Sequence, residues 1–393
     1  MNHIYFVCCT VYQLFVALYY ASKLSKNCLK VLIWTDATQG VNTDSFAFVF
    51  DKIFLIESEC NKPLIEKYWI RISRSGYFSH LYYRKKIFSN LNKNDVLLYF
   101  SEFDSSTCKL IKQFSRVSKK IILTEEGIGT YSCDKRIIPF NETLSIIIFG
   151  IESCTQIGNN KNIMAYIVKN PELLPFEKHK GRRIIQQNTM FNDNEWIKSL
   201  RIFNDRIRLE LEKFSRKRVL WLGQPLDSLG TDINTEIEIS NRIIRMFKEP
   251  YCTIIKKHPR DKVEKYKYIT NKNVCKYFVD HETWVPAEIL AGEIDPEIII
   301  TPISSAALNL YELRYGKKVI FCYKLFGIEV DDSWLDKYKD NEDVYNVESF
   351  DELRSVIEEI GSNPVRINNE DMTVNENKDI DYLNNLLKEV YDE

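Results

Sequence analysis

Four short polar segments follow apolar runs of the sequence and contain residue types that can carry out acid–base or anion-binding chemistry. The first begins where an apolar run ends at Thr124 and continues through Glu125, Glu126 and Gly127. When backbone donors hold one of two adjacent carboxylates, their pKa values separate, and the other carboxylate can act as a general base. The alternative interpretation of this segment is an acidic turn that only faces solvent.

The second segment follows the apolar run 219–222 and holds Gly223, Pro225 and Asp227. Glycine and proline are typical of a tight turn, and a turn here would bring Asp227 out of the sheet as another candidate base. Aspartate is also a common N-cap residue, so the alternative interpretation is that Asp227 caps the helix that follows.

The third segment places His258 between Lys257 and Pro259, with Arg260 next. The proline restricts the backbone of His258 to an extended conformation, which fixes the direction of the imidazole. An imidazole with a pKa near neutrality, surrounded by cations, suits a phosphate that gains charge as it departs. The alternative interpretation is a histidine with a structural role.

The fourth segment contains hydroxyl groups and small residues at the start of a helix. It runs from Thr301 to Ser304 and Ser305, which can offer side-chain and backbone donors to an anion, helped by the helix dipole. Plain N-capping by Ser304 is the competing explanation. Upstream, Pro286 predicts an early helical position, so Glu288 falls in a first helical turn, where it could bind ribose hydroxyls.

The elements that position these segments follow an alternating pattern. Short apolar runs alternate with amphipathic segments, which predicts an α/β protein with parallel sheets. Ligands of such sheets bind beyond the carboxyl ends of the strands, where the four segments lie. We expect strands at 4–9, 29–35, 52–56, 96–100 and 120–124 in the first half, and at 219–223, 252–256, 275–278, 298–301 and 318–323 in the second.

The repeated series predicts two Rossmann-like domains that face each other across a central cleft. We place the first domain at 1–185, a linker helix at 186–217, and the second domain, with a C-terminal helix, at 218–393. The prolines and basic residues of 171–183, followed by a charged helical pattern at 195–217, are expected to connect the two domains.

Composition limits the classes of function. A chain of 393 residues with 45% hydrophobic and 28% charged residues is globular and too long for one ordinary core. Its 54 basic and 55 acidic side chains nearly cancel, so no overall field favours nucleic acid as a partner. The ten cysteines are scattered through apolar runs, which predicts reduced buried thiols. The five histidines form no cluster at ligand spacing, so we expect no metal site.

The most apolar stretch is 4–21, which is about as long as a marginal membrane span. Thr10 and Gln13 interrupt it, and neither a basic segment before it nor a cleavage site after it supports a signal peptide. We therefore predict a buried strand, a turn at Thr10, and a helix at 12–25.

The ordered set of an acidic pair with glycine, His-Pro, Pro-x-Glu and Ser-Ser resembles that of the bacterial sialyltransferases. The closest resemblance is to the lipooligosaccharide sialyltransferases, glycosyltransferase family 52, whose members open with a strand and a turn like Cys9-Thr10. The resemblance covers residues 4 to about 323. It implies a GT-B fold, a CMP-sialic acid donor, inversion at the anomeric carbon, no metal or other cofactor, and a terminal sugar such as galactose on a bacterial surface glycan as acceptor.

By position, the resemblance also implies roles for individual residues. His258, Ser304 and Ser305 would hold the CMP phosphate and Glu288 the cytidine ribose, with further substrate contacts from Gly127, Gly223, Lys257, Pro259 and Thr301. In the family, the proposed base directly follows the proline of the Gly-x-Pro turn, whereas Leu226 precedes Asp227 here. The candidates for the base therefore remain Asp227, ranked first, then Glu126 and Glu125.

Three other functions remain open at the level of the sequence. They are a transferase for another nucleotide sugar, a nucleotide-sugar epimerase, and a carbohydrate-binding protein without catalysis. We expect a cytoplasmic protein, and both a homodimer and a peripheral contact with the inner membrane face are compatible with the sequence. Such a contact would involve the segment Tyr82, Tyr83, Arg84, Lys85 and Lys86, unless this is an ordinary exposed helix end.

Overall fold

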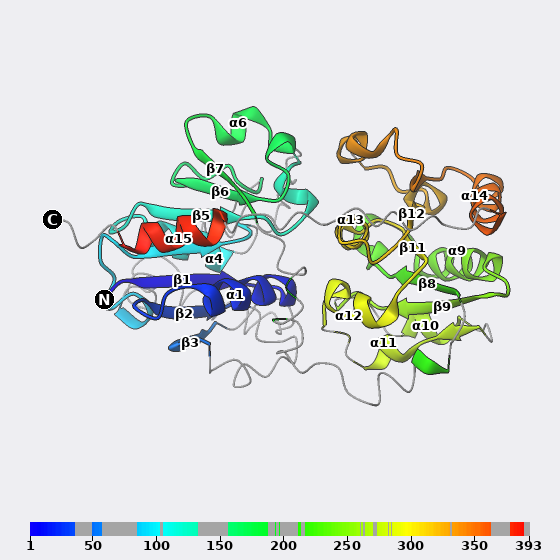
Figure 1. Ribbon diagram of the computed structural model, residues 1–393, viewed down its shortest axis with the longest axis horizontal. Helices are drawn as coiled ribbons and strands as arrows, with labels where there is room; N and C mark the ends of the chain where they lie inside the picture. The colour runs from blue at the N-terminus through cyan, green and yellow to red at the C-terminus, as the bar shows by residue number, and fades with distance from the viewer. Residues whose placement is uncertain are drawn as a thin grey trace. The chain divides into compact units, whose positions relative to one another are not determined.

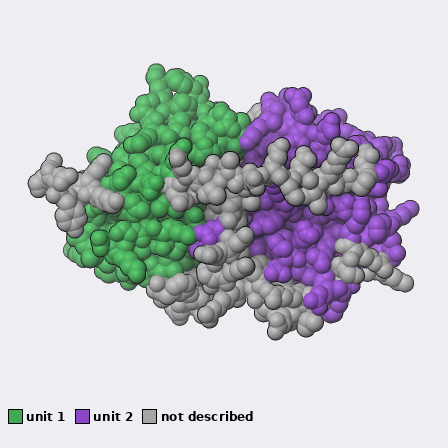
Figure 2. Space-filling model, in the orientation of Figure 1, with its two compact units in different colours: residues 1–190, 374–393 green, residues 191–373 purple. Residues whose placement is uncertain are grey.

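The computed structural model describes two compact units, each built around a parallel sheet (Figures 1 and 2). Unit 1 comprises Met1–Met190 and Val374–Glu393, and unit 2 comprises Phe191–Thr373. The described residues are 1–35, 49–56, 85–102, 105–132, 156–187, 193, 196, 211–213, 217–259, 261, 264–269, 273–281, 283, 285–330, 332–362 and 378–388.

The sheet of unit 1 has the strand order β3-β2-β1-β4-β5-β6-β7 in the described residues, with all neighbours parallel. Two of its inner strands, β4 and β6, consist of apolar residues with no exposed surface on either face, as expected for a parallel sheet covered on both sides. The strands are β1 (His3–Cys8), β2 (Leu29–Trp34), β3 (Lys52–Leu55), β4 (Val96–Tyr99), β5 (Lys120–Thr124), β6 (Ala165–Val168) and β7 (Arg183–Gln186).

The helices of unit 1 include α1 (Val11–Lys23), which begins because the Thr10 hydroxyl accepts a hydrogen bond from the backbone N–H of Gln13 at 3.3 Å. The predicted strand, turn and helix at the start of the chain are therefore confirmed. The other helices are α4 (Ser105–Phe114), α6 (Phe176–His179) and α15 (Lys378–Lys388), with 3₁₀ turns at Ile128–Thr130 and Pro171–Leu173.

The sheet of unit 2 has the order β10-β9-β8-β11-β12-β13, which is the Rossmann order counted from its first strand. Its strands are β8 (Lys217–Leu222), β9 (Tyr251–Lys256), β10 (Val274–Cys275), β11 (Ile298–Thr301), β12 (Lys318–Phe321) and β13 (Val344–Asn346). The helices are α9 (Ile233–Met246), α10 (Glu264–Lys267), α11 (Tyr277–Asp280), α12 (Ala287–Ile294), α13 (Ser305–Glu312) and α14 (Phe350–Ser362). The 3₁₀ turns are Leu226–Leu229, Tyr323–Phe326 and Ser333–Tyr338.

These two sheets confirm the predicted α/β class with two Rossmann-like units. One predicted strand is largely wrong, because 275–278 contributes only Cys275 to β10 and then turns into α11. Short apolar runs of this length fit a buried helix as well as a strand. The segment 171–183 was also misassigned as a connection between domains, since it lies within unit 1 between β6 and β7. The predicted linker helix at 186–217 falls largely outside the described residues.

The C-terminal helix belongs to unit 1, which corrects its predicted place in the second domain. The hydroxyl of Tyr20 on α1 donates to Asp379 of α15 at 2.7 Å, and both residues are buried. At the other end of the helix, the Lys120 ammonium donates to the carbonyl of Leu386 at 2.8 Å. These bonds join α15 to the first half of the chain, a return that hydrophobic periodicity alone does not predict.

Two further expectations concern thiols and membranes. The described cysteines take part in no disulfide bond; they are Cys8, Cys9, Cys28, Cys108, Cys252, Cys275 and Cys322. Among the helices that the structure describes, none combines the length and the apolar character that a membrane crossing requires.

Replacing Tyr20 by phenylalanine tests the docking of α15. The substitution removes a donor from the buried Asp379 carboxylate, so it should lower the free energy of unfolding by about 1 to 3 kcal/mol. Urea denaturation measures the change. Tyr268→Phe serves as the control, because Tyr268 is 64% exposed. An unchanged midpoint for Tyr20→Phe would contradict the docking.

Candidate functional site

In unit 2, the topology brings three of the predicted polar segments to one edge of the sheet. Strand β8 pairs in parallel with β9 on one side and with β11 on the other. Gly223 and Asp227 follow β8, His258 follows β9, and Ser304 follows β11. The chain order reverses between β8 and β11, and ligands of open α/β sheets bind at such a switch point.

The N-terminus of α13 lies at this edge and is the candidate anion site of the sequence prediction. Ser304 occupies the N-cap position with an extended backbone (φ −146°, ψ 125°), but its side chain makes no capping hydrogen bond. The alternative of plain side-chain capping by Ser304 is therefore wrong. Ser304 and Ser305 are both half-buried. An N-cap hydroxyl that does not bind its own helix leaves both the hydroxyl and the helix N-terminus able to serve an anion.

Glu288 lies in the first turn of α12, as predicted, and is only 3% exposed. Its Oε1 accepts a hydrogen bond from Nδ2 of Asn309 on α13 at 2.8 Å. This bond ties the first turn of α12 to the helix that begins at Ser305. Asn309 was missed from the sequence, although its place four residues after Ser305 puts both on one helical face.

The loop that carries His258 is shaped by Lys257. The Lys257 side chain is buried, and its ammonium donates to the carbonyls of His258 at 3.0 Å, Pro259 at 3.3 Å and Asp261 at 3.1 Å. Burial lowers the pKa of Lys257, and the nearby Asp261 carboxylate opposes that shift. Lys257 therefore holds the loop from inside. His258 is half-buried and Pro259 is exposed, whereas Arg260 lies outside the described residues.

The turn after β8 depends on a glycine. A Cβ added at Gly223 would lie 1.9 Å from the hydroxyl of Tyr266, which is 2% exposed. Asp227 then sits, exposed, in the 3₁₀ turn Leu226–Leu229. It does not cap the next helix, because Asp232 is the N-cap of α9 and accepts from the N–H groups of Asn234 and Thr235 at 3.0 Å. The capping alternative for Asp227 is wrong.

Thr301 points into the sheet. It has no exposed surface, and its hydroxyl donates to the carbonyl of Leu222 at 3.0 Å, which joins the ends of β11 and β8. The predicted substrate contact of Thr301 therefore has no accessible surface to act through, and the bond instead fixes the two neighbouring strand ends.

In unit 1, the two acids after β5 have different surroundings. Glu125 is 4% exposed and accepts hydrogen bonds from the Tyr131 hydroxyl and, at 2.6 Å, from the backbone N–H of Lys169. Glu126 is half-buried and accepts from the Thr10 hydroxyl at 3.3 Å. A backbone N–H holds Glu125, whereas the donor shown for Glu126 is a hydroxyl group, so the two acids differ in their surroundings.

Two further features surround Glu126. The thiol of Cys8 lies close enough for the carboxylate to contribute to its raised pKa, after burial and the neighbouring Cys9 thiol. The carbonyl of Gly127 accepts from the N–H of Thr130 at 3.0 Å and closes the turn after the acids. The chain at this edge is therefore ordered by its own hydrogen bonds.

The sequence interpretation also missed Glu102, a buried acid after β4. Glu102 has no exposed surface, and it accepts from the Tyr99 hydroxyl at 2.5 Å and from the N–H of Gly158 at 2.8 Å. Its position just after the run 96–100 was a signal of the same kind as that of Glu125. Its complete burial indicates a structural role.

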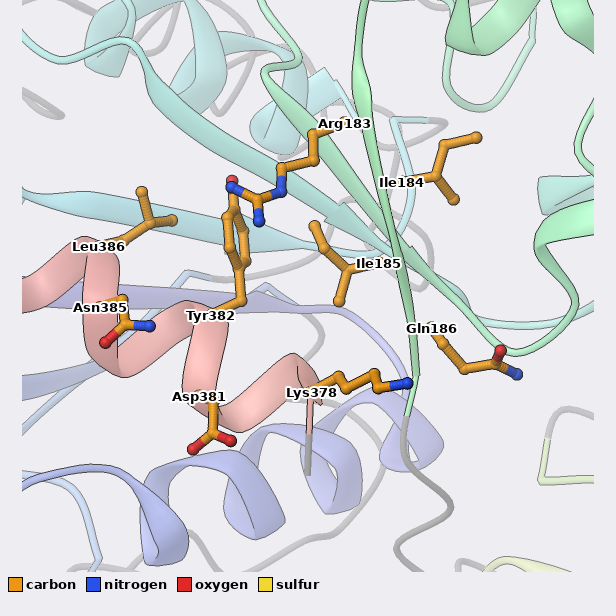
Figure 3. A pocket seen from close by; sticks show the side chains of 9 residues that line it. All are labelled: Arg183, Ile184, Ile185, Gln186, Lys378, Asp381, Tyr382, Asn385 and Leu386. Atoms are coloured by element: carbon orange, nitrogen blue, oxygen red, sulfur yellow. The ribbon is translucent and has the colours of Figure 1, made fainter. Parts of the chain in front are cut away.

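A groove of about 520 Å³ in unit 1 lies away from all predicted site residues (Figure 3). It runs between β7 and α15, and the guanidinium of Arg183 stacks 4.7 Å from the ring centre of Tyr382. The groove is lined by Arg183, Ile184, Ile185, Gln186, Lys378, Asp381, Tyr382, Asn385 and Leu386. Within the described part of the chain, no group of three or more histidine, cysteine or acidic side chains could hold a metal ion.

Comparison with known proteins adds a family and a fold. A family model described as Alpha-2,8-polysialyltransferase (POLYST) matches residues 4–323. No curated protein matches this chain in sequence. The predicted sialyltransferase family is thereby confirmed, whereas the narrower lipooligosaccharide family stays a prediction.

Solved structures with a similar fold include nucleotide-sugar enzymes. The UDP-GlcNAc 2-epimerase of Methanocaldococcus jannaschii has a TM-score of 0.59 at 12% identity, covering 99% of this chain and 100% of that one. The UDP-bound MnaA of S. aureus has a TM-score of 0.56 at 12% identity, covering 92% and 89%. The glycotransferase of kitacinnamycin has a TM-score of 0.50 at 11% identity, covering 99% and 95%. These similarities concern the fold alone, and with the two parallel-sheet units they confirm the predicted GT-B class.

Gly223→Ala tests the close approach of the turn after β8 to Tyr266. The added methyl group would overlap the Tyr266 hydroxyl, so the free energy of unfolding should fall by about 1 to 3 kcal/mol. In a Tyr266→Phe background the cost should shrink, because the nearest atom is gone. Thermal unfolding measures both, with Gly361→Ala as the control, since its added Cβ meets nothing within 4 Å. Equal costs in the two backgrounds would contradict the steric explanation.

Proposed function

The chain belongs to the alpha-2,8-polysialyltransferase family, and from that membership we propose that it transfers sialic acid from CMP-sialic acid to a hydroxyl group of a glycan. The observation that carries this proposal is the N-terminus of α13, whose N-cap serine makes no side-chain capping bond and follows β11 at the same sheet edge as His258, which follows β9 on the other side of β8. A sugar nucleotide with an anionic phosphate leaving group suits these hydrogen-bond donors.

The donor side of the proposal uses unit 2. The hydroxyls of Ser304 and Ser305 and the first N–H groups of α13 bind the phosphate of CMP, and the dipole of the helix favours its charge. Glu288 is only 3% exposed and is held by Asn309, so we give it the role of fixing α12 against α13, and the ribose contact expected from the sequence stays a prediction. Lys257 and Thr301 hold the loops in shape and do not contact the donor, since their polar atoms bond inside the unit.

The bond between the anomeric carbon and the phosphate oxygen breaks as negative charge grows on CMP. His258 and the two serines stabilise that charge, and a single preorganised donor in such a position contributes about 2 to 4 kcal/mol. The acceptor hydroxyl attacks the opposite face of the anomeric carbon, so the configuration inverts. Its proton passes to a carboxylate, and the products are the glycoside and CMP.

We assign the general base to Glu126. Asp227 ranked first on the sequence alone, but it is exposed, whereas Glu126 is half-buried beside the apolar end of β1. A half-buried carboxylate can meet the acceptor hydroxyl away from bulk water, whereas an exposed one faces solvent. Glu125 positions the acidic turn through its bonds to Tyr131 and Lys169.

The family name refers to α-2,8 links between sialic acids, so we propose a terminal sialic acid as the acceptor sugar. The galactose expected from the sequence is then the alternative acceptor. A cytoplasmic location with a peripheral membrane contact, and a homodimer, also remain proposals. Of the segment offered for that contact, Tyr82, Tyr83 and Arg84 lie outside the described residues.

A panel of nucleotide sugars tests the donor assignment. The purified protein should release CMP from CMP-sialic acid, faster when a sialylated oligosaccharide is added, and should leave UDP-GlcNAc unchanged. Chromatography of nucleotides and of labelled acceptors ending in sialic acid or galactose provides the measurement. Conversion of UDP-GlcNAc to its epimer without an acceptor would instead make the protein an epimerase.

Amide substitutions test the base. Glu126→Gln should lower turnover by about 100-fold or more while the dissociation constant of CMP stays constant, because the base acts on the acceptor. Asp227→Asn, which is matched in chemistry, should keep turnover within about threefold, as expected of an exposed side chain. The assignment is wrong if Asp227→Asn is inactive and Glu126→Gln keeps normal turnover.

Chelation tests the expectation that no metal takes part. Because the charge on the phosphate is met by protein donors, turnover in excess EDTA should stay within about twofold of the untreated rate. The rate of CMP release before and after dialysis against EDTA measures this. Loss of activity that Mg²⁺ or Mn²⁺ restores would show that a metal ion is required.

A further inference from the structure

A buried lysine of α10 connects the loops that carry Asp227 and His258. The ammonium of Lys265 donates to the carbonyl of Gln224, in the turn after β8, at 2.7 Å. It also forms an ion pair with Asp261, in the loop after β9, at 2.6 Å. A third partner is the carboxylate of Glu236 on α9.

The aromatic neighbour Tyr266 completes this group, which we call the Lys265 cluster: Lys265, Glu236, Asp261 and Tyr266. The Tyr266 hydroxyl donates to the same Asp261 oxygen at 2.6 Å and is the atom that requires glycine at position 223. In turn, the backbone N–H of Asp261 donates to the carbonyl of His258 at 2.9 Å. Both loops are therefore linked to the cluster by direct contacts.

The cluster is almost closed to solvent. The side chains of Lys265 and Glu236 are each 6% exposed and that of Asp261 is 3% exposed. The adjoining cavity of about 10 Å³ holds at most one water, and its lining includes Pro302 from the loop after β11. Burial raises the pKa of Glu236, and its bond to Lys265 opposes that shift.

Two carboxylates share one ammonium in this buried site, so the cluster is not an efficient way to stabilise the fold. Hydrophobic side chains of similar volume stabilise a protein at least as well as buried ion pairs do. The charged groups form directional bonds, and each of these bonds fixes the position of one loop relative to another.

We infer that Lys265 is a positioning residue that fixes the His258 loop and the Gln224 turn relative to each other, so that His258 meets the phosphate of the donor. Lys265 touches no substrate and acts through His258. This inference rests on the proposed function for its effect on turnover, but its effect on the two loops does not depend on which reaction the protein performs.

Amide hydrogen exchange tests the link without any assay of activity. In Lys265→Met, the amides of Gly223, Leu226 and Asp261 should exchange faster by about tenfold, because both loops lose a shared anchor. The control is Lys217→Met, which removes a partly exposed ion pair with Glu297 at the amino end of β8 and should leave these amides unchanged.

Tyr266→Phe provides a second variant that keeps all three charges and removes only the hydroxyl bond to Asp261. It should speed exchange of the Asp261 amide by about threefold in a folded protein, even if Lys265→Met does not fold. Unchanged exchange in both loops of a folded Lys265→Met, or at Asp261 in Tyr266→Phe, would overturn the inference.

A double-mutant cycle tests the effect on turnover. Lys265→Met should lower kcat for CMP release by about tenfold with little change in KM for the donor. In a His258→Ala background the same substitution should lower kcat less than about twofold, because the residue through which Lys265 acts is already absent. Equal losses in both backgrounds would show a general structural role and overturn the inference. If the wild type releases no CMP, the proposed function fails, and the exchange result alone decides the positioning role.

Discussion

Parallel pairing brings the carboxyl ends of neighbouring strands to one edge of a sheet, and the position of most polar residues in this chain depends on that constraint. In unit 2, β8 lies between β9 and β11, so polar segments that are far apart in sequence end at the same edge. Helices then start at this edge, and their N-terminal N–H groups point to the same side. The N-terminus of α13 is the candidate anion site at this edge.

The polar residues at these edges have two kinds of role, which burial separates. Lys257, Thr301 and Glu125 are nearly inaccessible, and each bonds to backbone groups or a tyrosine of its own unit. His258, Ser304 and Ser305 keep part of their surface accessible. The first group holds the loops in shape, and the second is available to a ligand. The Lys265 cluster belongs with the first group, because it holds the loops after β8 and β9 on their buried side.

Much of this arrangement could be predicted from the sequence, because hydrophobic runs of β-branched residues identify buried parallel strands. The strand predicted at 298–301 coincides with β11, and that at 120–124 with β5. Less could be predicted where the pattern is short or where partners are distant. The run 275–278 is too short to separate strand from helix, and the return of α15 to unit 1 depends on the contact between Tyr20 and Asp379, which are far apart in sequence.

For the site, the type of each residue and its position after a predicted strand identified the candidate segments. They did not predict which side-chain atoms are accessible to a ligand. The bonds of Lys257 to three carbonyls and the absence of a side-chain cap at Ser304 depend on rotamers and loop conformations, which a sequence pattern does not determine. Asn309 and Lys265 were missed for a related reason, because each acts through a partner on another element.

A crystal structure of the protein with CMP bound tests the proposed donor site. We expect the phosphate at the N-terminus of α13, within hydrogen-bond distance of the hydroxyl of Ser304 or Ser305 and facing the imidazole of His258. Nucleotide bound in unit 1, or in unit 2 with its phosphate away from α13, would contradict it.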